Sequence, residues 1–182
     1  ICSGLVGSEM CIRDRISDSD IRRPTGQIYE QTNGIVKFEP TKKLDFELEM
    51  GTVIGGSLPI GETLDFEGAE NLIFGYVLLN DWSARDIQAW EYQPLGPFLS
   101  KSFGTSISPW IVTPEALEPF KTTPPERDFQ LLPHFEDNKA FVFDIDLIVT
   151  LIEDGGTETD IVETNAKELY YSPVQQIIHH AS

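Results

Sequence analysis

Side chains that could do chemistry are concentrated between Asn80 and Trp110, directly after the apolar run from Leu72 to Leu79. A carboxylate at the end of a buried strand, followed by cationic and amide donors, is the usual lining of a polar pocket. This segment is therefore predicted to line one. Its polar and aromatic members include Asp81, Arg85, Asp86, Gln88, Glu91, Lys101, Trp82, Trp90, Tyr92 and Trp110.

A second group of acids lies between Leu44 and Val53, where apolar and acidic residues alternate. A period of two predicts a strand with its apolar residues on one face and Asp45, Glu47 and Glu49 on the other. Three neighbouring carboxylates repel one another, so they need water, arginines or a cation. From the spacing alone, a solvated strand face is the favoured interpretation, because strands with one solvated face are common, and a metal site is the alternative.

Composition limits the classes of partner. The chain has 182 residues and a net charge of −17, from 30 acidic and 13 basic side chains. Phosphate binding needs a basic face, so the charge argues against a nucleic-acid partner. The longest apolar runs are far shorter than the roughly 18 residues of a membrane helix, so no membrane partner is expected. Two cysteines, Cys2 and Cys11, form no disulfide framework, which predicts a reducing, cytoplasmic setting.

The first residues differ from the rest of the chain. The string ICSGLVGSEMCIRDR at residues 1–15 carries both cysteines, sustains no period, and resembles translated sequencing-adapter read-through. We therefore expect residues 1–16 to be a non-native or irregular leader, with a genuine N-terminal arm as the alternative. Residues 17–182 are expected to be a partial domain, truncated at both ends, because the C-terminal helix pattern stops without a glycine cap.

The predicted elements are mainly β-strands with a few short helices. Two stretches read as loops, an entry over residues 17–31 and a Pro-rich tract over 114–133 that contains one short helix. Asp144 and Asp146 could form a second metal pair, but the wet end of a half-exposed strand is the favoured interpretation. Strands are expected at 34–39, 44–53, 72–79, 141–152 and 159–165, a hairpin turn at 153–156, and helices at 63–71, near 114–120, and from Ser172 onward.

Four strings share one pattern: IRRPTGQ, LDFELEM, the block from Ile73 to Trp110, and QQIIHHAS at the C-terminus. Together they resemble the fumarylacetoacetate hydrolase family, in its eukaryote-type, tyrosine-pathway form, from about Ile21 to the end of the chain. The resemblance implies that this is part of a C-terminal catalytic domain built as a mixed β-sandwich roll.

The resemblance also implies a divalent cation, calcium or magnesium, held by Glu47, Glu49 and Asp81. This reverses the preference for a solvated face at the two glutamates, whereas Asp45 stays a structural or surface residue. Oxygen ligands suit hard cations, and glutamates two apart on a strand point to one side. A second cation site is implied at the turn after Lys101, through backbone oxygens of Lys101 and Thr105.

The implied reaction is hydrolysis of the carbon–carbon bond of fumarylacetoacetate, giving fumarate and acetoacetate. By resemblance, Arg85, Gln88 and Lys101 are catalytic donors to the leaving group, and Arg85, Gln88 and Tyr92 bind substrate. Donors of this kind suit an anionic transition state. Structural alternatives are an ion pair of Arg85 with Asp86 or Glu91 and core packing of Tyr92 and Trp90, which we favour for Trp90.

The family's catalytic base is a histidine upstream of the Arg-Pro loop, and nothing in residues 1–20 corresponds to it. His134, in the Pro-rich loop, is no substitute, and two further family site residues are expected beyond Ser182. The fragment itself is therefore expected to be inactive and its full-length parent active, as a cytoplasmic homodimer. The alternatives are a non-catalytic acidic cation-binding β module and another acylpyruvate hydrolase or decarboxylase.

Overall fold

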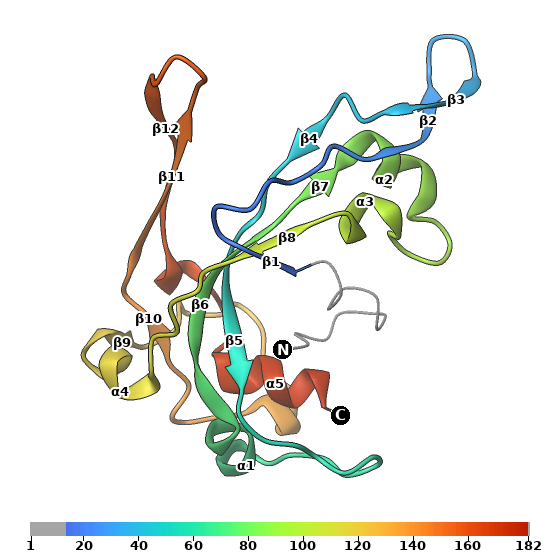
Figure 1. Ribbon diagram of the computed structural model, residues 1–182. Helices are drawn as coiled ribbons and strands as arrows, with labels where there is room; N and C mark the ends of the chain where they lie inside the picture. Colours follow the sequence, from blue (N-terminus) through green and yellow to red (C-terminus); the bar gives the residue numbers. More distant parts are fainter. Residues whose placement is uncertain (1–13, 182) are drawn as a thin grey trace. The chain divides into compact units, whose positions relative to one another are not determined.

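A computed structural model describes residues 14–181 (Figure 1). These residues form two compact units. Unit 1 consists of residues 14–51 and 76–111, and unit 2 of residues 52–75 and 112–181.

Strands dominate the described residues, which confirms the prediction of a mainly β chain with a few short helices. The strands are β1 (Asp14–Ile16), β2 (Thr25–Glu30), β3 (Ile35–Pro40), β4 (Leu44–Asp45), β5 (Leu48–Ile54), β6 (Ile73–Asp81), β7 (Ser83–Ala84), β8 (Thr105–Ile107), β9 (Lys121–Thr122), β10 (Val142–Phe143), β11 (Asp146–Ile152) and β12 (Glu158–Asn165). The helices are α1 (Phe66–Asn71), α2 (Arg85–Glu91), α3 (Leu99–Ser102), α4 (Pro114–Leu117) and α5 (Pro173–His180), with 3₁₀ turns η2 (Glu118–Phe120), η3 (Pro133–Phe135) and η4 (Ala166–Glu168).

In unit 1 the β2–β3 hairpin supports helix α2 (Figure 1). Ile28 of β2 and Ile87 of α2 form a buried cluster with Ala84, against which Phe103 packs. Gly26 allows this close approach, because a Cβ at that position would lie 2.8 Å from Ile87 Cδ1. The predicted entry loop over residues 17–31 is therefore wrong in its second half. Buried and exposed residues alternate along β2, as is typical of a strand. The proline and glycine near its start favoured a loop in the sequence-based prediction.

The largest sheet has the strand order β1-β8-β6-β5. Strand β8 is antiparallel to β6, with Thr105 opposite Asp81, and parallel to β1. Residues 1–13 of the predicted leader lie outside the described residues. The last three residues of the predicted leader, Asp14–Ile16, form β1. This strand pairs with β8, so these residues belong to the fold. The origin of the leader stays a prediction.

The predicted strand over residues 44–53 is interrupted. Its first part is β4, which pairs with β7, and its second part is β5, next to β6. At the break the Glu47 N–H donates to the Asn80 side-chain oxygen (3.1 Å), and the Asp81 N–H donates to the Glu47 carbonyl (3.2 Å). A side chain thus takes the place of a ladder partner, and the prediction of one continuous strand is wrong here. Arg85 nevertheless contacts both Asp45 and Glu47, and Glu47 converges with Glu49.

Strand β6 extends two residues beyond the predicted apolar run, to Asp81. Tyr76 and Val77 are buried, but Phe74 and Leu78 are 57% and 54% exposed. The prediction that both faces of this strand are buried is therefore wrong at Phe74 and Leu78, although Tyr76, on the same face, is buried. The reason is that an apolar run does not report which of its positions other segments cover.

Unit 2 contains the β11–β12 hairpin and a small core between α1 and α5, formed by Ala69, Val174 and Ile178. The hairpin turn and the start of α5 are confirmed. Ser172 and Gln175 form a reciprocal capping box at the start of that helix. None of the helices in the described part of the chain has the length and apolar character that crossing a bilayer requires.

Two boundaries in unit 2 differ from the prediction. Helix α1 begins after Asp65, whose carboxylate accepts from the Gly68 N–H, and not after Thr63. The predicted strand over 141–152 divides into β10 and β11. The Asp144 N–H donates to the Phe120 carbonyl, and the Ala166 N–H donates to the Ile145 carbonyl. Hydrogen bonds to two different segments therefore break the continuous ladder at Asp144 and Ile145.

Candidate metal centre

Three carboxylates converge in unit 1. Glu47 precedes β5, Glu49 lies on β5, and Asp81 is the last residue of β6. One oxygen from each lies within 4.8 Å of the others. The structure thus brings together the three residues predicted to hold a cation.

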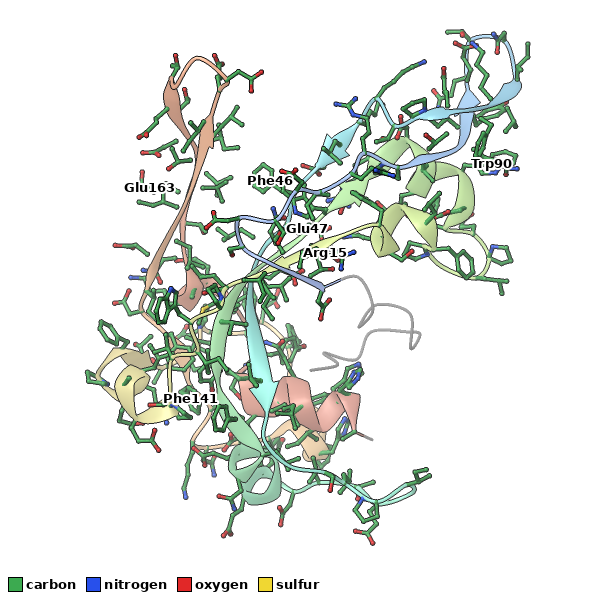
Figure 2. The ribbon with its side chains drawn as sticks, viewed as in Figure 1. Arg15, Phe46, Glu47, Trp90, Phe141 and Glu163 are labelled. Carbon is green, nitrogen blue, oxygen red and sulfur yellow. The ribbon has the colours of Figure 1, made fainter. Side chains whose placement is uncertain are left out.

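Neighbouring strands explain the convergence. Since β5 lies next to β6, two carboxylates spaced two residues apart meet a third from the end of the adjoining strand. The backbone bond between Asp81 and Glu47, 3.2 Å long, fixes their relative register. Figure 2 shows Glu47 and Phe46 in the short segment that connects β4 to β5. The break in the predicted strand is therefore part of what builds this cluster.

Two cations lie at the cluster. The Lys101 ammonium is 2.6 Å from Glu47 Oε2 and 3.1 Å from Asp81 Oδ2. Arg85 Nη2 lies 2.8 Å from Glu47 Oε1. Glu47 is thus held from both of its oxygens, and Lys101 links it to Asp81.

The electrostatic environment differs among the three acids. Desolvation, and then the neighbouring carboxylates, raise the pKa of Glu49, although its side chain retains contact with solvent. Desolvation also raises the pKa of Asp81 against the opposing effect of Lys101. For Glu47, burial acts in the same direction, but hydrogen bonds from Lys101 and Arg85 outweigh it and lower the pKa. Two of the three carboxylates therefore lack sufficient compensation from protein groups.

One atom shows this directly. Asp81 Oδ1 is buried, and it has no hydrogen-bond partner among the described residues. A buried carboxylate oxygen without a partner is costly unless a cation or donor meets it. Because every donor atom in the trio is a carboxylate oxygen, the set suits a hard divalent cation such as calcium, magnesium or manganese. The residues present fit such an ion.

Arg85 connects the carboxylate cluster to helix α2. Its Nε donates to Asp45 Oδ2 (2.7 Å), and its Nη1 donates to Gln88 Oε1 (3.0 Å). The predicted alternative, an ion pair with Asp86 or Glu91, is wrong. Asp86 accepts from the Thr41 hydroxyl and the Lys42 N–H, while Glu91 accepts from the Phe98 and Ser100 N–H groups. Asp86 and Glu91 therefore accept hydrogen bonds from neighbouring loop residues, and the ion pairs of Arg85 are with Asp45 and Glu47.

The aromatic residues of the segment lie further along α2. Trp90 is 41% exposed, donates to Gln27 Oε1 (2.6 Å), and stacks on Tyr29 with 6.0 Å between ring centroids (Figure 2). Its predicted packing in the core is therefore wrong. Tyr92 directly follows α2 and is 48% exposed. Contact of Tyr92 with substrate stays a prediction.

The predicted second cation site involves the turn between α3 and β8. Lys101 lies on α3, and Thr105 is the buried first residue of β8. The Lys101 side chain belongs to the carboxylate cluster, since its ammonium lies 2.6 Å from Glu47 Oε2. A role for the backbone oxygens of these two residues stays a prediction.

Sequence reasoning did not anticipate two contributors to the centre. Asn80 supports Glu47 through the 3.1 Å bond to its N–H, and Asp45 holds Arg85. Both lie inside the strings that carried the prediction. The sequence shows that both residues are polar. Local spacing does not indicate which distant side chain each will contact, as for Asp45 and Arg85, which are 40 residues apart.

Comparison with known proteins shows the family to which the chain belongs. The profile described as fumarylacetoacetate (FAA) hydrolase C-terminal matches residues 15–182. The chain belongs to this family. Similar curated relatives include fumarylacetoacetase from Arabidopsis thaliana, 50% identical over 166 residues, and from Dictyostelium discoideum, 48% identical over 168 residues. Each match covers 91% of this chain but 39% of the relative, so the chain spans about two fifths of their length.

A solved structure shares the fold of the family. It is a fumarylpyruvate hydrolase from Pseudomonas aeruginosa in complex with Mn²⁺ and pyruvate, with a TM-score of 0.50 and 15% sequence identity to this chain. The match covers 98% of this chain and 81% of the other. At this identity the likeness concerns the fold alone, and it agrees with the predicted β-rich domain of the family.

Proposed function

We propose that this chain is the cation-binding and leaving-group-binding part of a hydrolase that cleaves the carbon–carbon bond of fumarylacetoacetate, giving fumarate and acetoacetate. Family membership and relatives named fumarylacetoacetase, at 44–50% identity, support the reaction. The proposal concerns the full-length protein, because the chain spans 39% of the length of such relatives.

The observation that carries the proposal is the carboxylate trio with its attached arginine and lysine. Glu47, Glu49 and Asp81 would hold a divalent cation, which would orient and polarise the diketone when bound. The chain's own cations stand beside that position, since both Lys101 and Arg85 contact Glu47. This is the charge arrangement needed for an anionic substrate and an enolate-like leaving group.

Each polar residue then has a distinct role. Arg85 and Gln88, joined by a 3.0 Å hydrogen bond, offer N–H donors to the oxygens of the departing acetoacetate. Lys101 is nearly buried, with 14% of its side chain exposed, so its charge acts in a poorly hydrated environment where it is less screened. Tyr92, after α2, borders the substrate. The family resemblance assigns the base that activates water to a histidine outside these residues.

The cation is proposed to be calcium or magnesium. Full-length protein treated with a chelator should lose turnover of fumarylacetoacetate, measured by loss of substrate absorbance, and regain it when calcium or magnesium is added. Absence of turnover at saturating cation would overturn the proposed reaction. Full activity after verified removal of all divalent ions would overturn the cation requirement.

A second candidate reaction is hydrolysis of an acylpyruvate. The fold shared with a fumarylpyruvate hydrolase favours it, although that protein is 15% identical, against 50% for a fumarylacetoacetase. Comparing kcat/KM for fumarylacetoacetate and fumarylpyruvate separates the two. A higher value for fumarylpyruvate would replace the first proposal by the second.

Two features of the full-length protein follow from the family resemblance. We propose a homodimer, which light scattering after size-exclusion chromatography would test by giving twice the mass of one chain. We also propose a cytoplasmic location, which fluorescence of a tagged full-length protein in its own cell type would test.

A further inference from the structure

We propose that Asp45 is a positioning residue that aims Arg85 at the reacting molecule. This inference rests on the proposed function for its kinetic test, but the geometry behind it is independent of the substrate. Asp45 Oδ2 accepts from Arg85 Nε at 2.7 Å, the shortest hydrogen bond that this guanidinium makes among the described contacts.

The planar guanidinium explains why one contact can orient the others. Its donors point in fixed directions within one plane, so holding Nε determines where the two terminal nitrogens lie. With Nε on Asp45, Nη1 meets Gln88 Oε1 and Nη2 meets Glu47 Oε1, at 3.0 and 2.8 Å. Asp45 therefore orients the two nitrogens that face the other site residues.

The backbone makes Asp45 a fixed anchor. Strand β4 pairs with β7, with Asp45 opposite Ser83 and Leu44 opposite Ala84, which directly precedes Arg85. The Arg85 N–H also donates to the Lys43 carbonyl at 2.9 Å. Both ends of the Asp45–Arg85 contact are thus attached to the same short ladder, which limits how far the pair can separate.

The hydrogen bond from Arg85 to Asp45 has a second consequence. Arg85 is shared between Asp45 and Glu47. Without Asp45, the guanidinium can turn fully toward Glu47, which is one of the three proposed cation ligands. Asp45 thereby keeps Arg85 from becoming the exclusive partner of that ligand.

The kinetic test uses Asp45→Ala and Asp45→Asn in the full-length protein. A misdirected donor to the leaving group affects the transition state, so Asp45→Ala should lower kcat by about 10- to 100-fold, with a smaller change in KM. Asp45→Asn keeps an acceptor oxygen for Nε and should recover most of that loss. A kcat for Asp45→Ala within about twofold of wild type would overturn the proposal.

Two comparisons separate positioning from a structural role. In an Arg85→Ala background, adding Asp45→Ala should change kcat/KM by less than about twofold, because a residue that acts through Arg85 has nothing left to position. A further large loss there would overturn the proposal. Glu30→Ala is the matched control: its 2.8 Å ion pair with Lys37 has similar exposure but lies on the β2–β3 hairpin, so kcat/KM should not change.

A readout without substrate distinguishes failure of this inference from failure of the proposed reaction. In ¹H–¹⁵N spectra of the full-length protein, the Arg85 Nε–H signal, assigned with Arg85→Lys, should be protected from exchange and lose that protection in Asp45→Ala. Retained protection in Asp45→Ala would overturn the positioning role. Its loss in a protein inactive on fumarylacetoacetate would uphold the positioning while refuting that substrate.

Discussion

Two pairs of acids with the same spacing have different fates in this chain. Glu47 and Glu49 in unit 1 lie close to Asp81 from the neighbouring strand. The Asp81 side chain is 15% exposed. Asp144 and Asp146 in unit 2 share the Asn165 amide, and Asp144 also binds Lys167 at 2.9 Å, with 54% of its side chain exposed. Spacing alone therefore does not make a site. A third carboxylate and partial burial distinguish the first pair.

The difference also appears in the pKa values. Desolvation raises the pKa of Asp81 and Glu49, so the described protein groups do not fully offset the burial of their charges. Hydrogen bonds from Lys167 and Asn165 lower the pKa of Asp144, which is already compensated. The favoured interpretation of Asp144 and Asp146 as a wet strand end agrees with this arrangement. Within residues 14–181, the trio in unit 1 is the one group of three acids close enough to share an ion.

The largest expected effect tests whether the two pairs differ in cation binding. Asp81→Asn in the full-length protein removes one of three charges and should weaken calcium or magnesium binding by about 100-fold, or about 2.7 kcal/mol. Calorimetric titration measures it. Asp146→Asn is the control from the other pair and should leave the affinity unchanged. Equal losses in both variants would erase the distinction drawn between the pairs.

The next effect concerns a carboxylate of unit 1 that is structural. Asp86 accepts from the Thr41 hydroxyl with one oxygen and from the Lys42 N–H with the other, and an amide can replace only one of these acceptors. Asp86→Asn should therefore reduce the free energy of unfolding of the full-length protein by about 1–3 kcal/mol. Urea unfolding measures it, with exposed Asp20→Asn as the control.

The same variant has a definite pH dependence. Burial alone would raise the pKa of Asp86, but the hydrogen bonds from Thr41, Lys42 and Ile87 outweigh it and lower the pKa below its ordinary value of 3.8. Stabilisation by a carboxylate with a lowered pKa is complete above its unfolded-state pKa and is lost as the pH falls through its folded-state pKa. The difference between wild type and variant should therefore be constant near neutrality and shrink below pH 3.8. A difference that grows on acidification would contradict this assignment.

A smaller effect is expected from a neutral polar network in unit 2. Ser172 and Gln175 are fully buried and cap α5 reciprocally, and Gln175 also donates to the Phe135 carbonyl at 2.7 Å. Ser172→Ala should cost about 1 kcal/mol of unfolding free energy. Because neither cap residue titrates, the cost should be the same from pH 4 to 8. Ser57→Ala, in an exposed loop of the same unit, is the control.

The smallest effect is expected at the compensated pair itself. Asp144→Asn leaves an amide that still accepts a hydrogen bond, and the side chain is exposed, so its ion pair with Lys167 contributes little. The urea midpoint and the cation affinity should both stay within error of wild type. A clear loss of cation affinity would show that unit 2 holds a second site and would remove the contrast on which the other predictions depend.

Several features of the fold could be predicted because they depend on residues close in sequence. The cap of α5, the turn at 153–156 and strand β12 all have local signatures, and the structure confirms them. The strands over 44–53 and 141–152 were predicted as continuous, because periodicity does not register the distant carbonyls and amides that divide them. Strand β2 was predicted as a loop for a related reason: its buried face becomes recognisable only against α2.

The sequence by itself determined the membership of the centre. The types and order of Glu47, Glu49, Asp81, Arg85 and Lys101, within strings typical of one family, predict that these side chains gather in one cluster. Tertiary structure decided how their charges are matched: Arg85 meets Asp45 and Glu47, Lys101 joins Glu47 to Asp81, and one oxygen of Asp81 is left without a partner. The physical reason is that electrostatic and hydrogen-bond energies depend on distance through space, which strand pairing sets for residues far apart in the chain.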